Sequence, residues 1–476
     1  MSMPDTAAAR GTPRAARLSD TALEAALVAE LGDECVTRAA DIEPRYFTAY
    51  NERPGVRPRA LVRPRSVDEV SRALALCTRL VQPVVPQGGL TGLARGAVAL
   101  GGEVVLSMER FAGIDALDAA AGTLTVRAGT PLQVVQEAAD AAGFTFGVDL
   151  GARGSCQIGG MLATNAGGTR AIRYGTMREQ VLGLEAVLAD GTVVSSMNRM
   201  LKNNAGYDLK QLFIGSEGTL GVVTRAVLRL HPKLAAPATA LCRVRDYEAV
   251  VALWNRMRTL PELVSFEAMW PAFYDYVARH TPGVAAPFAA DGGFAVLIEC
   301  ATSAPGRDAR AALETALADA IDAGLADDAA LATSERQARD LWTLREGLAI
   351  DALPNLVNFD VSLPTGDLGA FAARCDAALR ARWPDIVCLF FGHVGDGNVH
   401  IGVSLAAMTD ADADEIDRRT YAIVREMGGS VSAEHGIGVL KRDYLAHTRS
   451  DSEIALMRTL KAALDPGGIL NPGKVL

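Results

Sequence analysis

Hydrophobic and polar positions in the first half of the chain follow the pattern of short strands interleaved with helices. Residues 60–62 form an apolar run typical of a strand, and Ser66 and Glu69 form a capping box that predicts the start of a helix. The predicted apolar stripe of that helix contains Val70, Ala73, Leu74, Cys77 and Leu80. Further strands are predicted at 83–85, 103–107 and 123–128, followed by a helix that begins at Pro131.

A β-hairpin is predicted at residues 183–195. Two strand-like runs, 183–189 and 192–195, flank the dipeptide Asp190-Gly191, which is typical of a type I′ turn. Strands, helices and glycine-rich turns mixed with a hairpin indicate an α+β domain rather than a regular doubly wound sheet.

The pattern changes after His231-Pro232. Long helical runs are predicted at 309–329 and 335–353, and strands at 294–299 and 358–363, which together indicate a second, α/β domain packed over the first. We therefore divide the chain into an N-terminal helical segment with a helix near 20–31, a glycine-rich domain, an α/β cap domain for the substrate and a C-terminal segment with helices: residues 1–54, 55–232, 233–385 and 386–476.

Composition narrows the class of protein. At 476 residues the chain is too long for one core. A net charge of -9 disfavours nucleic acid and anionic lipid as partners. Seven scattered cysteines without a CxxC pair indicate a reducing compartment, and no apolar run is long enough to span a membrane. We expect a cytoplasmic protein with a disordered start; an organelle presequence, suggested by Arg10, Arg14 and Arg17, is the alternative.

Three glycine-rich segments adjoin predicted strands, namely PQGGLTGL (86–93), GARGSCQIGGMLATNAGG (151–168) and FIGSEGTLGVVT (213–224). Glycine allows main-chain N–H groups to approach a pyrophosphate that a β-carbon would block. Neither GxGxxG nor a Walker loop is present. One such segment could be an ordinary surface turn, but three together favour a dinucleotide cofactor held mainly by the backbone.

Six histidines occur in the chain, and three of them lie in the polar motifs GHVGDGNVH and AEHG. His393 and His400 are seven residues apart, which is not the spacing of a helical HExxH site. A loop could still bring both to one ion, with Glu434 as a third ligand. The spacing alone leaves two interpretations open, a metal site or histidines that merely satisfy polar contacts in the core.

The glycine-rich segments in this order are similar to those of the vanillyl-alcohol-oxidase-type flavoprotein superfamily. Within that superfamily, the chain is most similar to the branch of D-lactate and D-2-hydroxyglutarate dehydrogenases, and the resemblance runs from about residue 55 to the C-terminus. The resemblance implies a two-subdomain FAD-binding domain at 55–232 and noncovalent FAD, because residues 87–96 contain no histidine or cysteine that could tether the flavin. By this resemblance the cofactor contacts Pro86, Gln87, Gly88, Gly89, Thr91, Gly92, Leu93, Asp149, Gly151, Ser155, Gly159, Gly160, Thr164, Asn165, Gly221, Val222 and Asn471.

The resemblance also assigns the polar motifs. It implies that His393, His400 and Glu434 bind a divalent metal, with zinc or manganese favoured, and that His435 is the base. Arg345, in LWTLREGLAI, would bind the substrate carboxylate. The implied reaction is oxidation of a D-2-hydroxy acid to the 2-oxo acid by hydride transfer to the flavin.

Three positions depart from relatives that act on D-2-hydroxyglutarate. Those relatives tend to carry a lysine where this chain has Asn358, an asparagine where it has Gly402 and a hydroxyl where it has Ala349. Each change removes a group that could hold a second carboxylate. D-lactate, or another acid with a less polar tail, therefore fits better than D-2-hydroxyglutarate.

Two alternatives stay open. The chain could be the FAD subunit of a glycolate-oxidase-type complex, or a noncatalytic subunit that only transfers electrons. The joint presence of His393, His400, Glu434, His435 and Arg345 argues against the second. The electron acceptor could be an electron-transferring flavoprotein, a quinone or a cytochrome, and a homodimer is one possible assembly.

Overall fold

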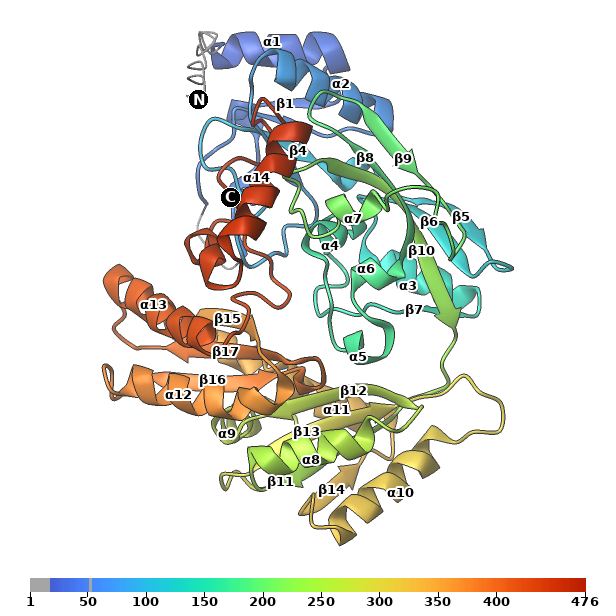
Figure 1. Cartoon of the computed structure of the whole chain (residues 1–476), viewed down its shortest axis with the longest axis vertical. Helices are drawn as coiled ribbons and strands as arrows, with labels where there is room; N and C mark the ends of the chain where they lie inside the picture. Colours follow the sequence, from blue (N-terminus) through green and yellow to red (C-terminus); the bar gives the residue numbers. More distant parts are fainter. Residues whose placement is uncertain (1–17, 51–53) are drawn as a thin grey trace, which may run out of the picture.

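The computed structural model describes residues 18–50 and 54–476, and these residues form three β-sheets (Figure 1). Two sheets lie in the upper half of Figure 1 and the third crosses the lower half. The question of a presequence falls on residues 1–17, which lie outside the described part. No helix of the described residues is long and apolar enough to cross a bilayer.

The first sheet has the order β1-β2-β4-β3 and is covered by two helices. Its bounds are β1 Val36–Arg38, β2 Ala60–Val62, β3 Val84–Gln87 and β4 Val104–Ser107, with α1 Asp20–Leu31 and α2 Val67–Arg79. The Ser66 hydroxyl accepts the N–H of Glu69, as the capping motif predicts, and α2 buries Val70, Ala73, Leu74 and Cys77. Short-range patterning therefore predicted α1, α2, β2, β3 and β4 but not β1. The capping box is only half formed, because the Glu69 carboxylate accepts the N–H of Arg65 rather than that of Ser66.

The second sheet has the order β5-β6-β10-β8-β9, and β7 pairs with the end of β10. The bounds are β5 Ile114–Asp118, β6 Thr123–Arg127, β7 Phe144–Phe146, β8 Val181–Val187, β9 Val193–Ser196 and β10 Val222–Pro232. Its helices are α3 Leu132–Ala141, α4 Ile158–Thr164, α5 Ala171–Tyr174, α6 Met177–Gln180 and α7 Lys210–Phe213. Residues of α3 and α4 pack with the sheet in one core, so the glycine-rich segment 151–168 is held against it.

The hairpin predicted at residues 183–195 is present, but the prediction of a type I′ turn is wrong. Gly191 has a φ of 89°, whereas Asp190 is not among the residues with positive φ, as a type I′ turn would require. The N–H of Gly191 instead donates to the carbonyl of Leu188 at 3.0 Å, and the N–H of Leu188 to the carbonyl of Thr192 at 2.9 Å. The connection is therefore a longer loop that ends in a left-handed glycine.

The third sheet is antiparallel, in the order β14-β11-β13-β12-β16-β17-β15. Its strands are β11 Ala238–Val244, β12 Leu263–Met269, β13 Phe294–Cys300, β14 Asp328–Leu331, β15 Val357–Ser362, β16 Val387–Gly392 and β17 Asn398–Ser404. Because β16 and β17 follow residue 385, the sheet is built from both of the last two predicted segments.

Two sets of helices cover this sheet. One core contains residues of α8 Tyr247–Met257, α10 Ala309–Asp322, α12 Leu368–Arg380 and α13 Asp410–Glu426. A separate core contains residues of α9 Pro271–His280 and α11 Glu335–Glu346. The face that carries α9 and α11 is also the face of His400 and Asp360, which are cross-strand partners.

Both long helices predicted in this region are shorter than expected. The run 309–329 ends at Asp322 and is followed by β14, and the run 335–353 ends at Glu346. Gly324 and Gly347 adopt φ values of 68° and 67°. A left-handed residue cannot continue an α-helix, so glycine ends each of them, and a 3-10 helix (Leu348–Ala352) follows the second.

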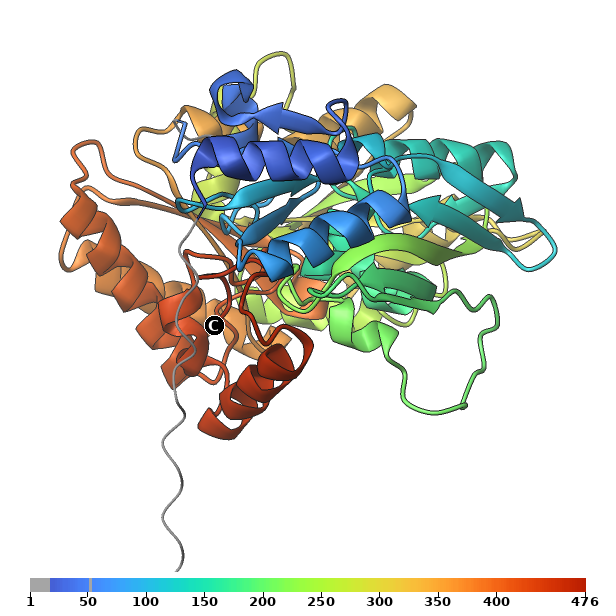
Figure 2. The same cartoon turned by 90° about the horizontal axis from the view of Figure 1, so that it is seen from above.

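The C-terminal segment returns to the first sheet after α14 Asp451–Leu464. Leu470 forms a parallel bridge with Val84, and the N–H of Asn471 donates to the carbonyl of Val84 at 2.8 Å. Figure 2 shows this segment, in red, beside the blue N-terminal elements. The last residues of the chain thus extend the first sheet, within the glycine-rich domain predicted at residues 55–232.

Candidate active site

A cavity of about 370 Å³ lies where the three glycine-rich segments meet. Its volume is within the range of about 300–1,000 Å³ that is usual for small-molecule sites. All but four of the predicted cofactor residues line it: Pro86, Gln87, Gly88, Gly89, Thr91, Gly92, Leu93, Gly151, Gly159, Gly160, Thr164, Gly221 and Val222. Glu434 and His435 complete the lining from the far end of the chain.

Close backbone packing explains the glycines of this cavity. A β-carbon on Gly89 would overlap the carbonyl oxygen of Ser155, and one on Gly159 would lie 2.8 Å from the Ala128 side chain. The first and second glycine-rich segments therefore touch through their main chains, which only glycine permits.

The other four predicted residues lie around the cavity in supporting positions. The Asp149 carboxylate pairs with Arg170 at 3.3 Å, and Ser155 presents its carbonyl to Gly89. The Asn165 side chain accepts the N–H of Arg178, and the Asn471 amide donates to the carbonyls of Gly96 and Glu217; the contact distances are 2.9, 2.9 and 2.8 Å.

Buried side-chain acceptors without a partner fit a bound dinucleotide. Gln87 Oε1 and Gln157 Oε1 have no hydrogen-bond partner in the structure, and both residues line the cavity. Asn471 Oδ1 is also buried and unpartnered. Since buried polar atoms are almost always hydrogen-bonded, a ligand that carries donors would satisfy these atoms.

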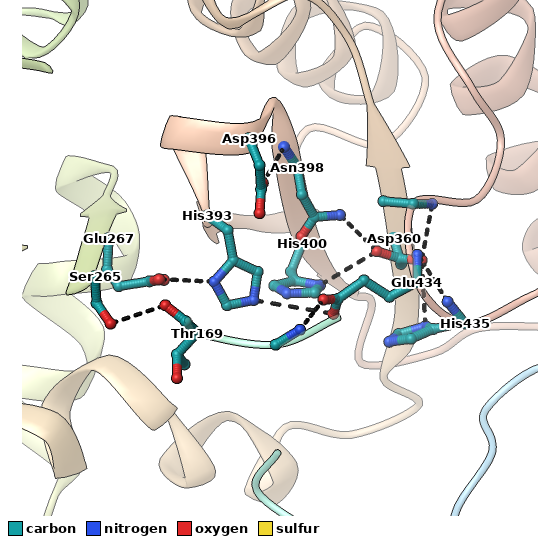
Figure 3. Close-up of polar contacts among 12 residues, drawn as sticks. Thr169, Ser265, Glu267, Asp360, His393, Asp396, Asn398, His400, Glu434 and His435 are labelled. Atoms are coloured by element: carbon teal, nitrogen blue, oxygen red, sulfur yellow. Dashed lines mark hydrogen bonds and ion pairs between the residues drawn. The ribbon is translucent and has the colours of Figure 1, made fainter. Parts of the chain in front are cut away.

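At the Glu434 end of the cavity, the predicted metal ligands come together (Figure 3). Ligand atoms of His393, His400 and Glu434 all lie within 4.8 Å of one another. His393 follows β16, His400 lies on β17 and Glu434 lies in the loop after α13. A β-carbon on Gly167 would lie 2.6 Å from Glu434 Oε1, and the N–H of Gly168 donates to that same oxygen at 2.6 Å.

Asp360, on β15, organises the loop that carries Glu434 and His435. Its Oδ2 accepts the main-chain N–H groups of Ala433, Glu434 and His435 at 3.1, 2.8 and 2.9 Å. Burial acts to raise the pKa of Asp360, but His435 and Lys441 hold it well below its usual range. Asp360, His400 and His435 form a second group with metal-ligand spacing, which shares His400 with the first.

His435 has the properties of a neutral base. Burial lowers the pKa of its imidazole, although Asp360 opposes this effect, and the ring lies 5.9 Å from that of His400 between centroids. Neutral imidazole can accept a proton. Asn398 and Asp396 shape the neighbouring loop: the Asn398 amide donates to Asp360 Oδ1 at 2.7 Å, and Asp396 Oδ1 accepts the N–H of Asn398 at 3.3 Å.

Arg345 reaches the site, but it does so as the partner of a buried carboxylate. Its Nε donates to Glu267 Oε2 at 2.8 Å, and its Nη2 lies 2.5 Å from the same oxygen. The other Glu267 oxygen accepts the Nδ1–H of His393 at 2.7 Å. Burial acts to raise the pKa of Glu267, whereas Arg345 and His393 lower it to about 2.

Sequence motifs did not reveal three of the residues that hold this site, namely Glu217, Glu267 and Asp360. The Glu217 carboxylate binds the loop that follows His435. Glu267 and Asp360 are the only charged residues of their strand segments, VSFEAM and VNFDVS. A charge in a buried strand is costly unless it is paired, so this pattern was the available signal.

Comparison with known proteins identifies the family. The family model of the C-terminal domain of FAD linked oxidases matches residues 233–475, and that of an FAD binding domain matches residues 58–196. This chain belongs to the family of FAD-linked oxidases. The predicted FAD cofactor and the predicted class of flavin-dependent oxidoreductase are thereby confirmed.

Relatives within the FAD-linked oxidase family are similar over nearly the whole chain. A D-2-hydroxyglutarate dehydrogenase of Xanthomonas citri pv. viticola is 40% identical over 92% of this chain and 93% of its own. A mitochondrial D-2-hydroxyglutarate dehydrogenase of Arabidopsis thaliana is 39% identical, with 87% and 74% covered.

Solved structures confirm the predicted fold class of this FAD-linked oxidase. p-Cresol methylhydroxylase superimposes with a TM-score of 0.76 at 16% identity, over 96% of both chains. Alkyldihydroxyacetonephosphate synthase gives 0.72 at 18% identity, over 94% of this chain and 85% of its own. The α+β architecture of this flavoprotein type is therefore present.

Proposed function

We propose that this FAD-linked oxidase oxidises a small D-2-hydroxy acid to the 2-oxo acid, with a divalent cation held by His393, His400 and Glu434. The observation that carries the proposal is the position of Glu434 and His435, which line the flavin cavity while Glu434 completes a three-ligand group. A substrate held by that group would therefore lie against the flavin. The similarity to D-2-hydroxyglutarate dehydrogenases supports the reaction class.

The residues divide the work between proton removal and orientation. His435 accepts the proton of the substrate hydroxyl, because burial keeps its imidazole neutral. Arg345 binds the substrate carboxylate through its Nη groups, since Nε donates to Glu267 and the buried Nη2 has no hydrogen-bond partner. A divalent ion held by His393, His400 and Glu434 would act as a Lewis acid toward the hydroxyl oxygen of the substrate. FAD, when bound, supplies the hydride acceptor.

Noncovalent attachment of the flavin is part of the proposal. Cys156 lies in the cavity wall, but burial raises the pKa of its thiol to about 11, which leaves little thiolate to attack a flavin. No other cysteine lines the cavity among the described residues.

We further propose a substrate with a short or apolar tail, such as D-lactate. Asn358 and Gly402 are cross-strand partners, and the next pair on the same face is Asp360 with His400. A β-carbon on Gly402 would lie 3.4 Å from the side chains of Ile350 and Leu356. The space beside the metal group is thus bordered by apolar atoms. D-2-hydroxyglutarate is the second candidate, because the relatives named above carry that name.

The test is an anaerobic absorbance titration of the purified protein with D- and L-isomers of lactate, 2-hydroxyglutarate and longer 2-hydroxy acids. One D-acid should bleach the flavin band near about 450 nm, and a chelator should abolish the bleaching. His400→Ala should lose the response, whereas His280→Ala should keep it, because His280 is exposed and contacts Tyr276. A flavin that no 2-hydroxy acid bleaches would favour the noncatalytic-subunit alternative.

A further inference from the structure

Glu267 divides its two oxygens between the proposed metal site and the proposed substrate site. It lies on β12 and is 1% exposed. Its Oε1 is 2.7 Å from Nδ1 of His393, and its Oε2 is 2.8 Å from Nε of Arg345 (Figure 3 shows the first contact). No other carboxylate among the described residues contacts both of these side chains.

The contact with His393 fixes which ring nitrogen can bind an ion. A carboxylate only accepts hydrogen bonds, so Nδ1 of His393 must carry the proton. Nε2 is left with its lone pair on the side of Glu434, whose Oε2 lies 3.9 Å away. Such carboxylate–histidine pairs orient metal ligands and raise their basicity.

The contact with Arg345 fixes the plane of the guanidinium. Its Nε and Nη2 both face Glu267, and its Cζ lies 5.0 Å from the centroid of the Phe391 ring. The side chain is buried at 6% exposure, so these contacts leave it one orientation. Among the described residues the hydrogen bond of this guanidinium comes from Nε, and the buried Nη2 has no hydrogen-bond partner, which leaves the Nη groups for a ligand.

Charge balance requires an anion between Arg345 and His393. A cationic guanidinium beside a divalent ion in a buried site would repel the ion, because the local dielectric is low. One carboxylate between Arg345 and His393 offsets this repulsion on both sides.

We propose that Glu267 is a positioning residue for both the metal site and the substrate site. Its single carboxylate orients His393 as a metal ligand and Arg345 as the residue that binds the substrate carboxylate. This inference rests on the proposed function above. It adds that metal affinity and substrate affinity depend on the same buried group.

The test compares Glu267→Gln with the wild type. An amide has one acceptor and one donor, so it can satisfy His393 or Arg345 but not both. The expected result is a 10–100-fold weaker Zn²⁺ affinity, measured without substrate by competition with a chelating dye. The KM for the D-2-hydroxy acid should also rise about tenfold at saturating Zn²⁺, while the flavin content stays at the wild-type level.

Glu299→Gln is the matched control. Glu299 lies on the neighbouring strand β13, opposite Ser265, and is 7% exposed. Its carboxylate accepts from Trp342 and Thr239 and contacts neither His393 nor Arg345. Its substitution removes a buried charge of the same sheet and should leave Zn²⁺ affinity and KM unchanged.

Three outcomes would overturn the inference, and they separate it from the proposed function. Wild-type values of both Zn²⁺ affinity and KM in Glu267→Gln would contradict the shared role of Glu267 and leave the proposed function intact. A wild-type protein that binds no Zn²⁺ and oxidises no 2-hydroxy acid would contradict both the shared role and the proposed function. If Glu267→Gln does not fold, nitrogen-15 NMR of the wild-type Zn²⁺ complex decides: His393 must be protonated at Nδ1, and a proton at Nε2 contradicts the inference.

Discussion

Glu217 and Ile437 are 220 residues apart in the sequence, yet the Glu217 carboxylate accepts the main-chain N–H of Ile437 at 2.7 Å. Its second oxygen accepts the N–H of Gly438 at 2.8 Å. Glu217 belongs to the third glycine-rich segment, and residues 437 and 438 follow Glu434 and His435 after one intervening glycine. Hydrogen bonds therefore join the cavity wall at Glu217 to residues 434–438, which we call the catalytic loop.

We expect Glu217→Ala to impair catalysis more than flavin binding. Removing the carboxylate leaves two N–H groups of the loop without their acceptor, at a cost of about 1–3 kcal/mol each. The loop that carries Glu434 and His435 should shift, and kcat should fall at least about tenfold at saturating metal. Flavin absorbance per protein and steady-state kinetics measure the two effects.

Glu185→Gln is the control for Glu217→Ala. Glu185 is another buried carboxylate of the glycine-rich half, but it binds Thr224 and Arg225 at 2.9 and 2.8 Å, away from the catalytic loop. Its loss should lower the melting temperature and spare kcat. Equal losses of kcat in both variants would contradict a specific role for Glu217.

A single β-carbon should separate flavin-binding glycines from permissive ones. In Gly89→Ala the new carbon would overlap the Ser155 carbonyl, which is backbone and cannot move aside easily. In Gly366→Ala it would meet nothing within 4 Å, and Gly366 does not line the cavity. We expect Gly89→Ala to lose at least about tenfold in FAD affinity, measured by fluorescence titration of the apoprotein, and Gly366→Ala to keep the wild-type affinity. A wild-type affinity in Gly89→Ala would contradict the need for close packing between Gly89 and Ser155 in the cavity wall.

Residues that act through local motifs were the ones that the sequence could identify. The glycines that line the cavity and the three metal-ligand candidates lie in short runs whose composition is itself the signal, as with Gly88-Gly89 and His393. The Ser66 cap of α2 was predicted for the same reason, because its hydrogen bond to the N–H of Glu69 spans three residues.

Long-range partners and backbone angles could not be obtained from such motifs. Glu267 and His393 are separated by 126 residues, and only the antiparallel pairing of β12 with β16 brings them together. The ends of α10 and α11 depended on left-handed glycines inside runs with helical periodicity. Gly347 alone shortened a predicted helix by a third, because glycine is compatible with either conformation until the tertiary structure selects one.

Cys156 should resist thiol reagents with or without flavin. All seven cysteines are buried, and burial raises the pKa of the Cys156 thiol to about 11. Because protein atoms alone bury this side chain, labelling with N-ethylmaleimide should be slow on both the apoprotein and the holoprotein, although Cys156 lines the cavity. Mass spectrometry of labelled peptides measures the rate, with the urea-unfolded protein as the positive control and Cys156→Ser as the blank. Rapid labelling of Cys156 in the folded apoprotein would contradict this burial.

Asn358→Lys should change the preference for the substrate tail. Asn358 is exposed and points to the same face as Asp360, two residues further along β15, and its cross-strand partner is Gly402. A lysine there would place an ammonium group beside the region where a second carboxylate of the substrate would lie. The ratio of kcat/KM for D-2-hydroxyglutarate to that for D-lactate should rise about tenfold, equivalent to about 1.4 kcal/mol. Asn358→Met, of similar length but uncharged, should not raise it, and added salt should weaken the effect of the lysine. A wild-type enzyme that already prefers D-2-hydroxyglutarate would overturn the proposed substrate and leave the proposed reaction intact.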